Sequence, residues 1–563
     1  MITFTRNAIE LVLNVDMVIL SPWGSLDGFL QGNLGELVTT SPFFKSNPDK
    51  KVLIDAVSEE FLTASQVVQL ASAVAFTLRT IYSIGAGDVV ALCTQNSILL
   101  PPIHYGILYR GAAVSPSNFA YNADELGHQI TTTSAKLFIT SSEKLKSLGD
   151  REAFQERIGS TVIVTLEQFA SVVRQTARSN SISVYSEKPL KVDNSSDWKD
   201  VPAYLIFSSG TTGLPKAVTT THGNILANCQ QQWKTAGEFY STKRIFGAVL
   251  PMSHIFGLSK FIYSTIYFAP SIILFPYYDF EFLLRSICKY RIDALHAVPP
   301  ILLALAKNPI VSKYPIMDSL KVIMSGAAPL SETLIRALQK DLKLDVKQLY
   351  GLTETSPITH FFTYDAQRYN PMSVGWLVPS LQARLVGFDG KDVAQGQRGE
   401  LWLRGPNIMK GYYNNQKATG SAITPDRWFK TGDIAIVDET GQFFIVDRVK
   451  ELIKSKGHQV APAELESILL SHSDIKDAAV IGVDNPERAT EDPRAYIAIA
   501  KGSNTSPLDI VKWFNSKVSR YKRLTGGVVV IDSIPKTASG KILRRKLIDR
   551  RDDVVWIETP SKF

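Results

Sequence analysis

The feature that most constrains the fold is an alternation of short apolar runs with amphipathic segments over about the first 400 residues. The apolar runs are Asp88–Cys93, Leu137–Thr140, Tyr204–Phe207, Ile245–Leu250, Ala294–Val298 and Leu320–Gly326. Strands that are apolar throughout must be covered on both faces, and helices between successive strands give parallel pairing. The sequence therefore predicts an α/β fold in which parallel sheets are flanked by helices.

From about residue 382 the pattern changes to hairpin-like strands. Gln382–Val393 contains the turn pair Asp389-Gly390, and Gly399–Gly405 has the pattern of a further strand. We therefore expect a small β-rich subdomain over residues 380–446. A compact α+β pattern follows; it consists of helices at 461–472 and 506–519 and strands at 477–483 and 495–500.

A chain of 563 residues is too long for a single ordinary core and should divide into domains. We predict a large N-terminal domain over residues 1–446, a hinge over 447–450, and a small mobile C-terminal domain over 451–563. The order of the residues before Met17 is left open.

Composition narrows the class of protein. The hydrophobic fraction of 45% and the charged fraction of 20% are ordinary for a globular protein. The net charge of +8 is modest for this length, and the basic residues are scattered up to about the last hundred positions. We therefore expect anionic small ligands such as nucleotides rather than a nucleic-acid partner.

The cysteines and the apolar stretches exclude further classes. Cys93, Cys229 and Cys288 are far apart and odd in number, which argues against a disulfide framework or a structural zinc and for a reducing compartment. Residues 261–278 carry no charge, but Pro270 and Pro276 interrupt them, so we expect a buried core segment and no transmembrane helix. No secretory signal is expected at the N-terminus, where Glu10 and Asp16 interrupt the apolar stretches and no clean cleavage site follows.

A loop of glycines, hydroxyls and one lysine follows the apolar run that ends at Phe207. Its sequence, SSGTTGLPK, lies between a predicted strand and a helix-like segment. Backbone amides, hydroxyls and an ammonium group suit a polyphosphate. The Walker A loop, however, has glycine before its lysine and serine or threonine after it, whereas Pro215 and Ala217 stand here. A different nucleotide-using class must explain the loop, although such a turn taken alone is often a plain surface loop.

Four further stretches carry candidate chemistry, and each has a simpler structural explanation when taken alone. QLYGLTETSP offers an aromatic ring to stack on a base and a carboxylate to hold magnesium, or else a helix cap. TGD offers a carboxylate that can accept hydrogen bonds from ribose hydroxyls, although the same three residues are also typical of an ordinary turn. DRVKELIKSKGHQV concentrates basic residues, as a solvated helix face also does. PKTASGKILRRK places a lysine in a Gly/Ser loop, as an exposed tail also does.

Together, in this order and spacing, the five stretches resemble the adenylate-forming superfamily, which includes acyl-CoA synthetases, 4-coumarate-CoA ligases, firefly luciferase and peptide-synthetase adenylation domains. The resemblance runs from about residue 40 to about residue 550 and includes Asn118–Ile130 and Ser325–Leu330. It implies that a carboxylate attacks the α-phosphate of ATP to give an acyl-adenylate and pyrophosphate. A thiolate, that of coenzyme A or of a carrier, then gives a thioester and AMP.

The resemblance also implies roles for individual residues in ATP binding. The β- and γ-phosphates would be held by Ser208, Ser209, Gly210, Thr211, Thr212 and Lys216. Glu354 would ligate Mg²⁺, with Thr353 near the α-phosphate. Ala328, Gln348 and Tyr350 would bound the adenine, and Asp433 and Arg448 would hold the ribose hydroxyls.

Other implied roles concern the movement between the two half-reactions. Lys541 resembles the mobile lysine that bridges the carboxylate and the α-phosphate, and Lys450 matches the hinge. The residues that match those facing AMP or coenzyme A in the thioester-forming state are Lys454, which we assign a catalytic role, Lys456 and Gly457, which we assign to coenzyme A, and Gln459, which we assign to AMP. His254 matches the residue at the mouth of the acyl pocket.

Several positions of the implied acyl pocket depart from the hydroxycinnamate ligases. Phe256 stands where those enzymes usually have tyrosine, so a phenolic substrate would lose a hydrogen bond worth about 1 kcal/mol. Leu349 replaces a glycine that relatives often carry and should narrow the channel, to which we also assign Pro357 and Ile358. Lys260 falls near a small polar lining residue and either points away on its helix or pairs with a distal carboxylate.

These departures favour an apolar aryl or medium-chain acid over 4-coumarate. Tyr277 stands where many CoA ligases have lysine or arginine, which removes one expected contact to a CoA phosphate. Transfer to a separate acyl-carrier protein therefore stays open as an alternative. A catalytically inactive nucleotide or acyl sensor is a third possibility, but it would not need Lys541. The final residues, Ser561–Phe563, resemble a peroxisomal address, so we expect either a peroxisomal or a cytoplasmic protein.

Overall fold

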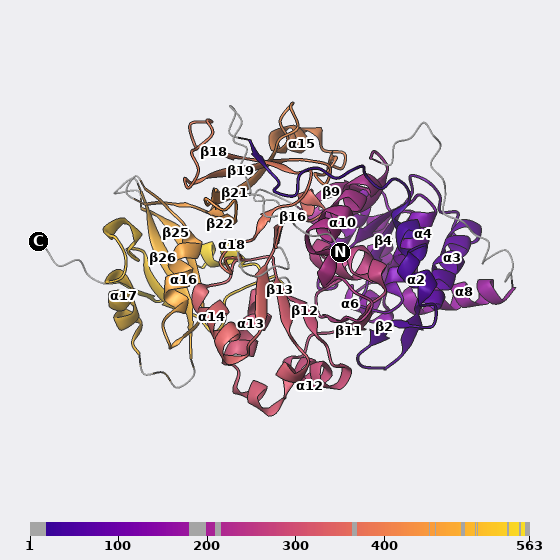
Figure 1. The fold of residues 1–563 in the computed structure, drawn as a ribbon, viewed down its shortest axis with the longest axis horizontal. Helices are drawn as coiled ribbons and strands as arrows, with labels where there is room; N and C mark the ends of the chain where they lie inside the picture. Colours follow the sequence, from indigo (N-terminus) through magenta and orange to yellow (C-terminus); the bar gives the residue numbers. More distant parts are fainter. Residues whose placement is uncertain are drawn as a thin grey trace, which may run out of the picture.

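A computed structural model describes most of the chain. The described residues are 18–179, 199–208, 215–362, 369–449, 451–455, 458–485, 490–500, 503, 505–537, 540–550 and 553–557. The α/β architecture is confirmed: a large N-terminal domain contains parallel and mixed sheets, and a smaller α+β domain follows it (Figure 1).

The first large sheet has the strand order β20-β9-β8-β5-β4-β6-β7. Strands β8, β5, β4, β6 and β7 are mutually parallel, as their apolar runs predict. The strand bounds are β4 Val89–Cys93, β5 Ala113–Pro116, β6 Leu137–Thr140, β7 Val162–Thr165, β8 Pro202–Ser208, β9 Lys216–Thr221 and β20 Gly411–Tyr412. The main covering helices are α3 Ala64–Thr80, α4 Leu100–Tyr109, α5 Ala123–Thr133, α8 Leu166–Ser179 and α10 His222–Ala236.

The second large sheet has the order β14-β13-β12-β10-β11-β2-β3, with every pair parallel except the terminal β2–β3 hairpin. Its strands are β2 Lys51–Asp55, β3 Phe61–Thr63, β10 Ile245–Ala248, β11 Ser271–Leu274, β12 Ala294–Ala297, β13 Val322–Ser325 and β14 Asp345–Gln348. Helices α12 Phe280–Tyr290, α13 Pro299–Lys307 and α14 Glu332–Asp341 connect them.

The carboxyl ends of these parallel strands bring three of the motifs to one edge of the sheet. The chain leaves β10 toward His254, leaves β13 into Ser325–Leu330, and leaves β14 into Tyr350. Ligands of open parallel sheets bind outside the carboxyl ends of the strands. This edge is therefore where a site should be sought.

An antiparallel sheet of order β1-β18-β19-β21-β22 covers the range predicted to be β-rich. Its strands are β1 Ile19–Leu20, β18 Gln382–Val386, β19 Gly399–Arg404, β21 Phe429–Val437 and β22 Phe443–Arg448. The edge strand β1 comes from the N-terminal segment, which its sequence did not predict. In Figure 1 strands β18, β19, β21 and β22 lie above the junction between the N-terminal body and the C-terminal domain.

The segment after the Gly/Thr-rich loop is a strand, so the helix-like prediction there was wrong. β8 and β9 pair in antiparallel register with Ser208 opposite Lys216. The run Lys216–Thr221 is rich in threonine and valine, whose branched side chains favour the pleated, half-buried surface of a sheet. The loop thus closes a hairpin. The following helix, α10, begins only at His222 and is capped by Thr221.

The C-terminal domain has a sheet of order β25-β26-β27-β28 and three short helices. The elements are α16 Pro462–Leu470, β25 Ile475–Asn485, β26 Thr490–Ile499, α17 Pro507–Asn515, β27 Gly527–Val530, α18 Arg544–Ile548 and β28 Val555–Trp556, preceded by the hairpin β23 Ile453–Ser455 and β24 His458–Val460. Its apolar core runs from Ile453 to Val528 and shares no member with the large core, which ends at Phe443. The predicted limits of the hinge, 447–450, stay a prediction.

Candidate active site

Tyr350, Asp433 and Arg448 form one hydrogen-bonded group between the two domains. Tyr350 begins β15 (Tyr350–Gly351), and Asp433 and Arg448 are register partners on β21 and β22. The Tyr350 hydroxyl donates to Asp433 Oδ2 at 2.6 Å, and Arg448 Nε lies 3.0 Å from Asp433 Oδ1. Burial raises the pKa of Asp433, while the charge of Arg448 and the Tyr350 hydrogen bond oppose that shift. The carboxylate is thus fixed on both oxygens, as a ribose-binding carboxylate would need to be.

Gln348 and Ala328 lie at the end of β14 and in the turn after β13. Gln348 Oε1 accepts from Leu330 N at 3.0 Å, and its Nε2 donates to Pro371 O at 2.8 Å. Both ends of the amide are therefore occupied by backbone groups. Ala328 is half-buried in the same turn. Gln348 thus fixes the turn that carries Ala328. Because both ends of its amide are occupied, Gln348 would border an adenine through the shape of this turn and not through a hydrogen bond.

Glu354 and Ser208 meet on the side of the predicted phosphate loop. Glu354 lies in the 3-10 turn Thr353–Thr355, and its Oε1 accepts from Ser208 Oγ at 2.8 Å and from the Tyr412 hydroxyl at 3.1 Å. The ammonium of Lys216 lies 5.2 Å from the centre of the Tyr412 ring. Tyr412 thus connects the lysine and the carboxylate, and the sequence motifs gave no signal for it. Residues 209–212, also predicted to hold phosphates, lie outside the described part of the chain.

Lys541 is half-buried beside these groups. Burial and the charge of Arg448 lower the pKa of Lys541, and the charges of Glu451, Asp433 and Glu354 oppose the shift. Its charge in turn contributes to lowering the pKa of His254. The side chain that sequence analysis assigned to a mobile lysine therefore lies within electrostatic reach of the carboxylates on one side and of the predicted acyl mouth on the other.

A glycine permits the close approach that brings Lys541 to this place. Gly540 has a φ of +79°, which disfavours other residues, and a Cβ built on it would lie 2.9 Å from Pro300 Cδ at the start of α13. The turn is closed by Thr537 N donating to Lys541 O at 2.8 Å and Lys541 N donating to Thr537 Oγ1 at 3.1 Å. The backbone of the C-terminal domain thus contacts the N-terminal domain one residue before the lysine.

The residues predicted for the thioester-forming half lie apart from this site or outside the description. Lys454 is exposed on β23, opposite Gln459 on β24, and its backbone N donates to Glu491 Oε2 at 2.7 Å. Among the described residues, no hydrogen bond or ion pair joins the Lys454 side chain to the group around Asp433. Lys450, Lys456 and Gly457 lie outside the described residues, and only the backbone of Gln459 is described. Their roles stay predictions.

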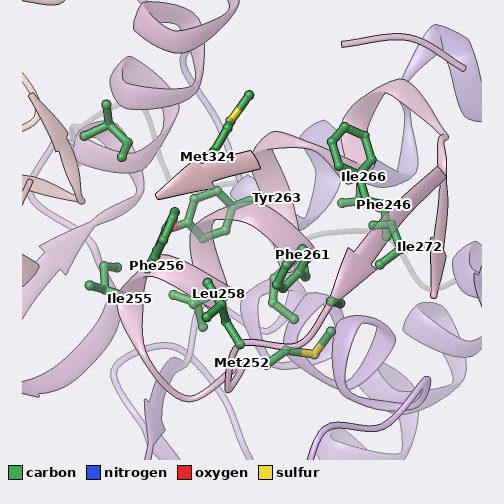
Figure 2. Packing of buried hydrophobic residues seen from close by; sticks show 14 of the residues in the cluster. Phe246, Met252, Ile255, Phe256, Leu258, Phe261, Tyr263, Ile266, Ile272 and Met324 are labelled. Carbon is green, nitrogen blue, oxygen red and sulfur yellow. The ribbon is translucent and has the colours of Figure 1, made fainter. Parts of the chain in front are cut away.

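His254 caps α11 (Ile255–Leu258) at the predicted mouth of the acyl pocket, with Nδ1 accepting from Phe256 N at 3.3 Å. Burial and the charge of Lys541 lower its pKa to about 4, so that the imidazole is neutral near pH 7. The Phe256 ring borders Gly326, and Leu349, Pro357 and Ile358 are also buried. Figure 2 shows Phe256 among Ile255, Leu258, Tyr263 and Met324. The side chains at these predicted pocket positions are thus buried and apolar, and their role in binding an acyl group stays a prediction.

Asp447, at the end of β22, joins the β-rich sheet to the C-terminal domain. Its Oδ1 accepts from Arg448 N at 2.7 Å, and its Oδ2 accepts from Ala463 N at 3.1 Å in the first turn of α16. Burial raises its pKa to about 7, although these hydrogen bonds and the charge of Arg544 oppose the shift and the charge of Glu466 adds to it. The folded protein therefore holds this proton more tightly than the unfolded chain, whose aspartates titrate near pH ~4.

We expect the variant Asp447→Asn to be more stable relative to the parent protein at pH 8 than at pH 5. Protonated Asp447 stabilises the fold fully at pH values below the pKa of an aspartate in the unfolded chain. This stabilisation is lost as the pH rises through about 7, the pKa of Asp447 in the folded protein. The asparagine amide can accept one of the same hydrogen bonds and never ionises. Between pH 5 and pH 8 the stability of the variant relative to the parent protein should rise by about 1 kcal/mol or more. The measurement is the urea midpoint of both proteins at the two pH values. An equal difference at both pH values would contradict the raised pKa.

Two family models match most of the chain. AMP-binding enzyme matches residues 43–413, and AMP-binding enzyme C-terminal domain matches residues 464–541. The fold is that of an adenylate-forming enzyme. The chain belongs to the AMP-binding enzyme family. No helix among the described residues is long and apolar enough to span a membrane.

Curated relatives cover nearly the same length. A probable 4-coumarate–CoA ligase 2 of Dictyostelium discoideum is 35% identical over 90% of this chain and 93% of its own. A probable CoA ligase CCL5 of Humulus lupulus is 36% identical over 91% and 92%, and a peroxisomal OPC-8:0-CoA ligase 1 of Arabidopsis thaliana is 34% identical over 91% and 92%. The chain is accordingly an enzyme of the acid–thiol ligase class.

Solved structures confirm the fold at lower identity. The anthranilate CoA ligase AuaEII in complex with anthranoyl-AMP is 23% identical with a TM-score of 0.82, covering 92% of this chain and 97% of its own. ATP-bound MatB from Rhodopseudomonas palustris is 24% identical with a TM-score of 0.79, covering 92% and 99%. The arrangement of a large domain and a smaller C-terminal domain is therefore shared across the family.

Proposed function

We propose that this enzyme joins an apolar aryl or medium-chain carboxylic acid to coenzyme A through an acyl-adenylate, with ATP and Mg²⁺. The observation that carries the proposal is the position of Lys541, which is close enough to Asp433 and Glu354 for their charges to act on it and close enough to His254 to lower that pKa. The charge of one ammonium would therefore act on both a nucleotide and the carboxylate of an acid at the pocket mouth.

In this proposal side chains of the enzyme hold the nucleotide and offset the charge repulsion between the attacking carboxylate and the phosphate. Asp433 and Arg448 hold the ribose, Tyr350 and Ala328 bound the adenine, and Lys216 contacts the terminal phosphates. Lys541 offsets the negative charge shared by the attacking carboxylate and the α-phosphate, which would otherwise repel each other. The neutral imidazole of His254 adds no charge at the pocket mouth.

The donor atoms near the phosphate loop suit Mg²⁺, which prefers hard oxygen ligands and keeps several waters. The Glu354 carboxylate and the Ser208 hydroxyl are 2.8 Å apart. Among the described residues no group of three or more His, Cys, Asp or Glu side chains could hold a metal. Mg²⁺ would therefore take Glu354 as its protein ligand and its remaining ligands from the phosphates and water, where it would stabilise the pyrophosphate leaving group.

The proposal is tested by pyrophosphate release from purified enzyme with ATP, Mg²⁺ and panels of cinnamic, benzoic, medium-chain fatty and dicarboxylic acids, with and without coenzyme A. We expect acid-dependent pyrophosphate release accompanied by consumption of coenzyme A. If pyrophosphate appears while coenzyme A is not consumed, the acyl acceptor is a different thiol, as a carrier protein would be. If no acid gives pyrophosphate, the proposed activity is wrong.

A further inference from the structure

Lys260 is a fully buried lysine for which the structure describes no carboxylate partner. It lies in the π-helical segment Ser259–Ser264 that continues α11, and its side chain has no exposure. Its Nζ donates to Gln232 Oε1 and to the Tyr240 hydroxyl, the latter at 3.2 Å. A charged lysine is almost never fully buried unless it is paired. Sequence analysis left two orientations open for Lys260: it points away from the pocket, or it pairs with a distal carboxylate. The contacts around its side chain decide between them.

Those surroundings connect Lys260 to the acyl pocket through His296 on β12. The His296 ring meets Phe256 edge-on at 6.0 Å and Phe261 at 5.6 Å between ring centres. Lys260 stands in the sequence between Phe256 and Phe261, the two residues whose rings meet His296, and its charge contributes to lowering the pKa of His296. Lys260 also follows Phe256 by four residues on a continuous helical segment, which puts both on one side of it.

His296 supplies a second observation that indicates a ligand. It has no exposure, and among the described residues neither of its ring nitrogens has a hydrogen-bond partner. Buried polar groups are nearly always hydrogen-bonded, because an unpaired one costs about 1–3 kcal/mol. Lys260 has three N–H donors, of which two are accounted for. The surroundings of Phe256 and Lys260 thus hold hydrogen-bonding capacity that the described side chains do not use.

The ammonium is held in place by a buried polar chain that ends at a predicted pocket residue. Gln232 Nε2 donates to Asn228 Oδ1 at 2.9 Å, and Asn228 Nδ2 donates to Ile358 O at 2.6 Å. Gln232 and Asn228 both belong to α10, one turn apart. Lys260 Nζ is 5.1 Å from the centre of the Phe361 ring, on the same strand as Ile358. The lysine is therefore positioned on rigid elements rather than free to turn away.

We propose that the acyl pocket ends in a polar floor, where Lys260 and His296 bind a hydrogen-bond acceptor at the far end of the acyl chain, best satisfied by a second carboxylate. The proposal rests on the proposed CoA-ligase function and narrows its substrate class to acids with an apolar body and a polar far end. Phe256 and the apolar side chains around it in Figure 2 would contact the body of such an acid. Burial lowers the pKa of Lys260 to about 7, and an anionic group bound beside it would restore its charge.

The first test compares acids of equal length on the unmodified enzyme: octanoic acid, its terminal methyl-ketone analogue and octanedioic acid. We expect kcat/KM to be about ten- to a hundredfold higher for octanedioic acid than for octanoic acid, with the ketone between them. If the ketone and the diacid gave equal kcat/KM values, both above that of octanoic acid, recognition would rest on hydrogen bonding alone and the polar floor would still be supported. Equal values for all three acids, or a preference for octanoic acid, would overturn the proposal.

The second test replaces Lys260 by methionine, which keeps the length of the side chain and removes the donor. We expect the preference for octanedioic acid, measured as the ratio of its kcat/KM to that of octanoic acid, to fall to about one. Lys144→Met serves as the matched control, because Lys144 is also buried but donates to Tyr121 O, which is not among the groups that contact Lys260 or His296. A purely structural lysine would lower both activities equally and leave their ratio unchanged, which would overturn the proposal.

Calorimetric binding of the same acids separates this proposal from the proposed function. If no acid releases pyrophosphate, the ligase activity is wrong, but tighter binding of octanedioic acid than of octanoic acid would still support the polar floor. If octanoic acid is turned over and the two acids bind equally, the ligase function stands and the polar floor is wrong.

Discussion

Lys541→Ala should reduce the rate of acyl-adenylate formation by at least about a hundredfold, while thioester formation from supplied acyl-adenylate stays largely intact. The reason is that the charge of Lys541 acts both on Asp433, in the predicted nucleotide site, and on His254, at the predicted acyl mouth. Loss of such a preorganised charge typically costs on the order of 3 kcal/mol in the transition state. The measurement is single-turnover pyrophosphate release in the first half-reaction and CoA consumption in the second.

The control for this variant is Lys546→Ala, which removes an exposed lysine of α18 in the same domain. We expect both half-reactions to be unchanged in that protein. If Lys541→Ala slowed both halves equally, Lys541 would not act in adenylation alone, and the proposal that the C-terminal domain takes different positions in the two halves would be contradicted.

Asp433→Asn should weaken ATP binding by about ten- to fortyfold. The carboxylate accepts from the Tyr350 hydroxyl and pairs with Arg448, and the amide would leave Arg448 without its counter-charge. Hydrogen bonds to charged groups are worth about 1.5–3 kcal/mol, and Arg448 is partly exposed, so we expect the lower half of that range. The measurement is the Kd for ATP by calorimetry, with the urea midpoint recorded alongside.

Asp392→Asn provides a matched ion-pair control. Asp392 pairs with Arg384 at 2.9 Å in the same antiparallel sheet, away from the nucleotide site. Both variants should lose some stability, but only Asp433→Asn should lose affinity for ATP. A similar loss of affinity in the two proteins would mean that Asp433 acts through the stability of the sheet and not through the nucleotide.

The apolar runs predicted the parallel strands because burial on two faces leaves little freedom in composition. The strand β9 was missed because Lys216–Thr221 has few apolar residues and follows a loop that precedes a helix in many nucleotide-binding folds. Its pairing with β8 is decided by tertiary contact, which overrides local pattern. The two-residue strand β1 is too short to carry any pattern of its own.

The grouping of Tyr350, Asp433 and Arg448 was predictable because each lies in a short motif with a chemical reason for its residue type, and their role in holding a nucleotide stays a prediction. Tyr412 was not, because it stands alone in the sequence and acquires its role only by meeting Glu354 and Lys216 in the fold. The direction of Lys260 was likewise open, since a helix can present a lysine to either side until its neighbours are known. In the fold, hydrogen bonds to Gln232 and Tyr240 fix the orientation of the Lys260 side chain.

The separation of the two apolar cores has a consequence for the cost of rearranging the molecule. Because the cores share no side chain, turning the C-terminal domain as a rigid body would leave the packing inside each core intact. The resisting contacts are small, such as the fit of Gly540 against Pro300 and the contact of Lys307 Nζ with Ile475 O at 3.4 Å. Mutations at this seam should therefore change how long each orientation lasts without changing how well either domain is folded.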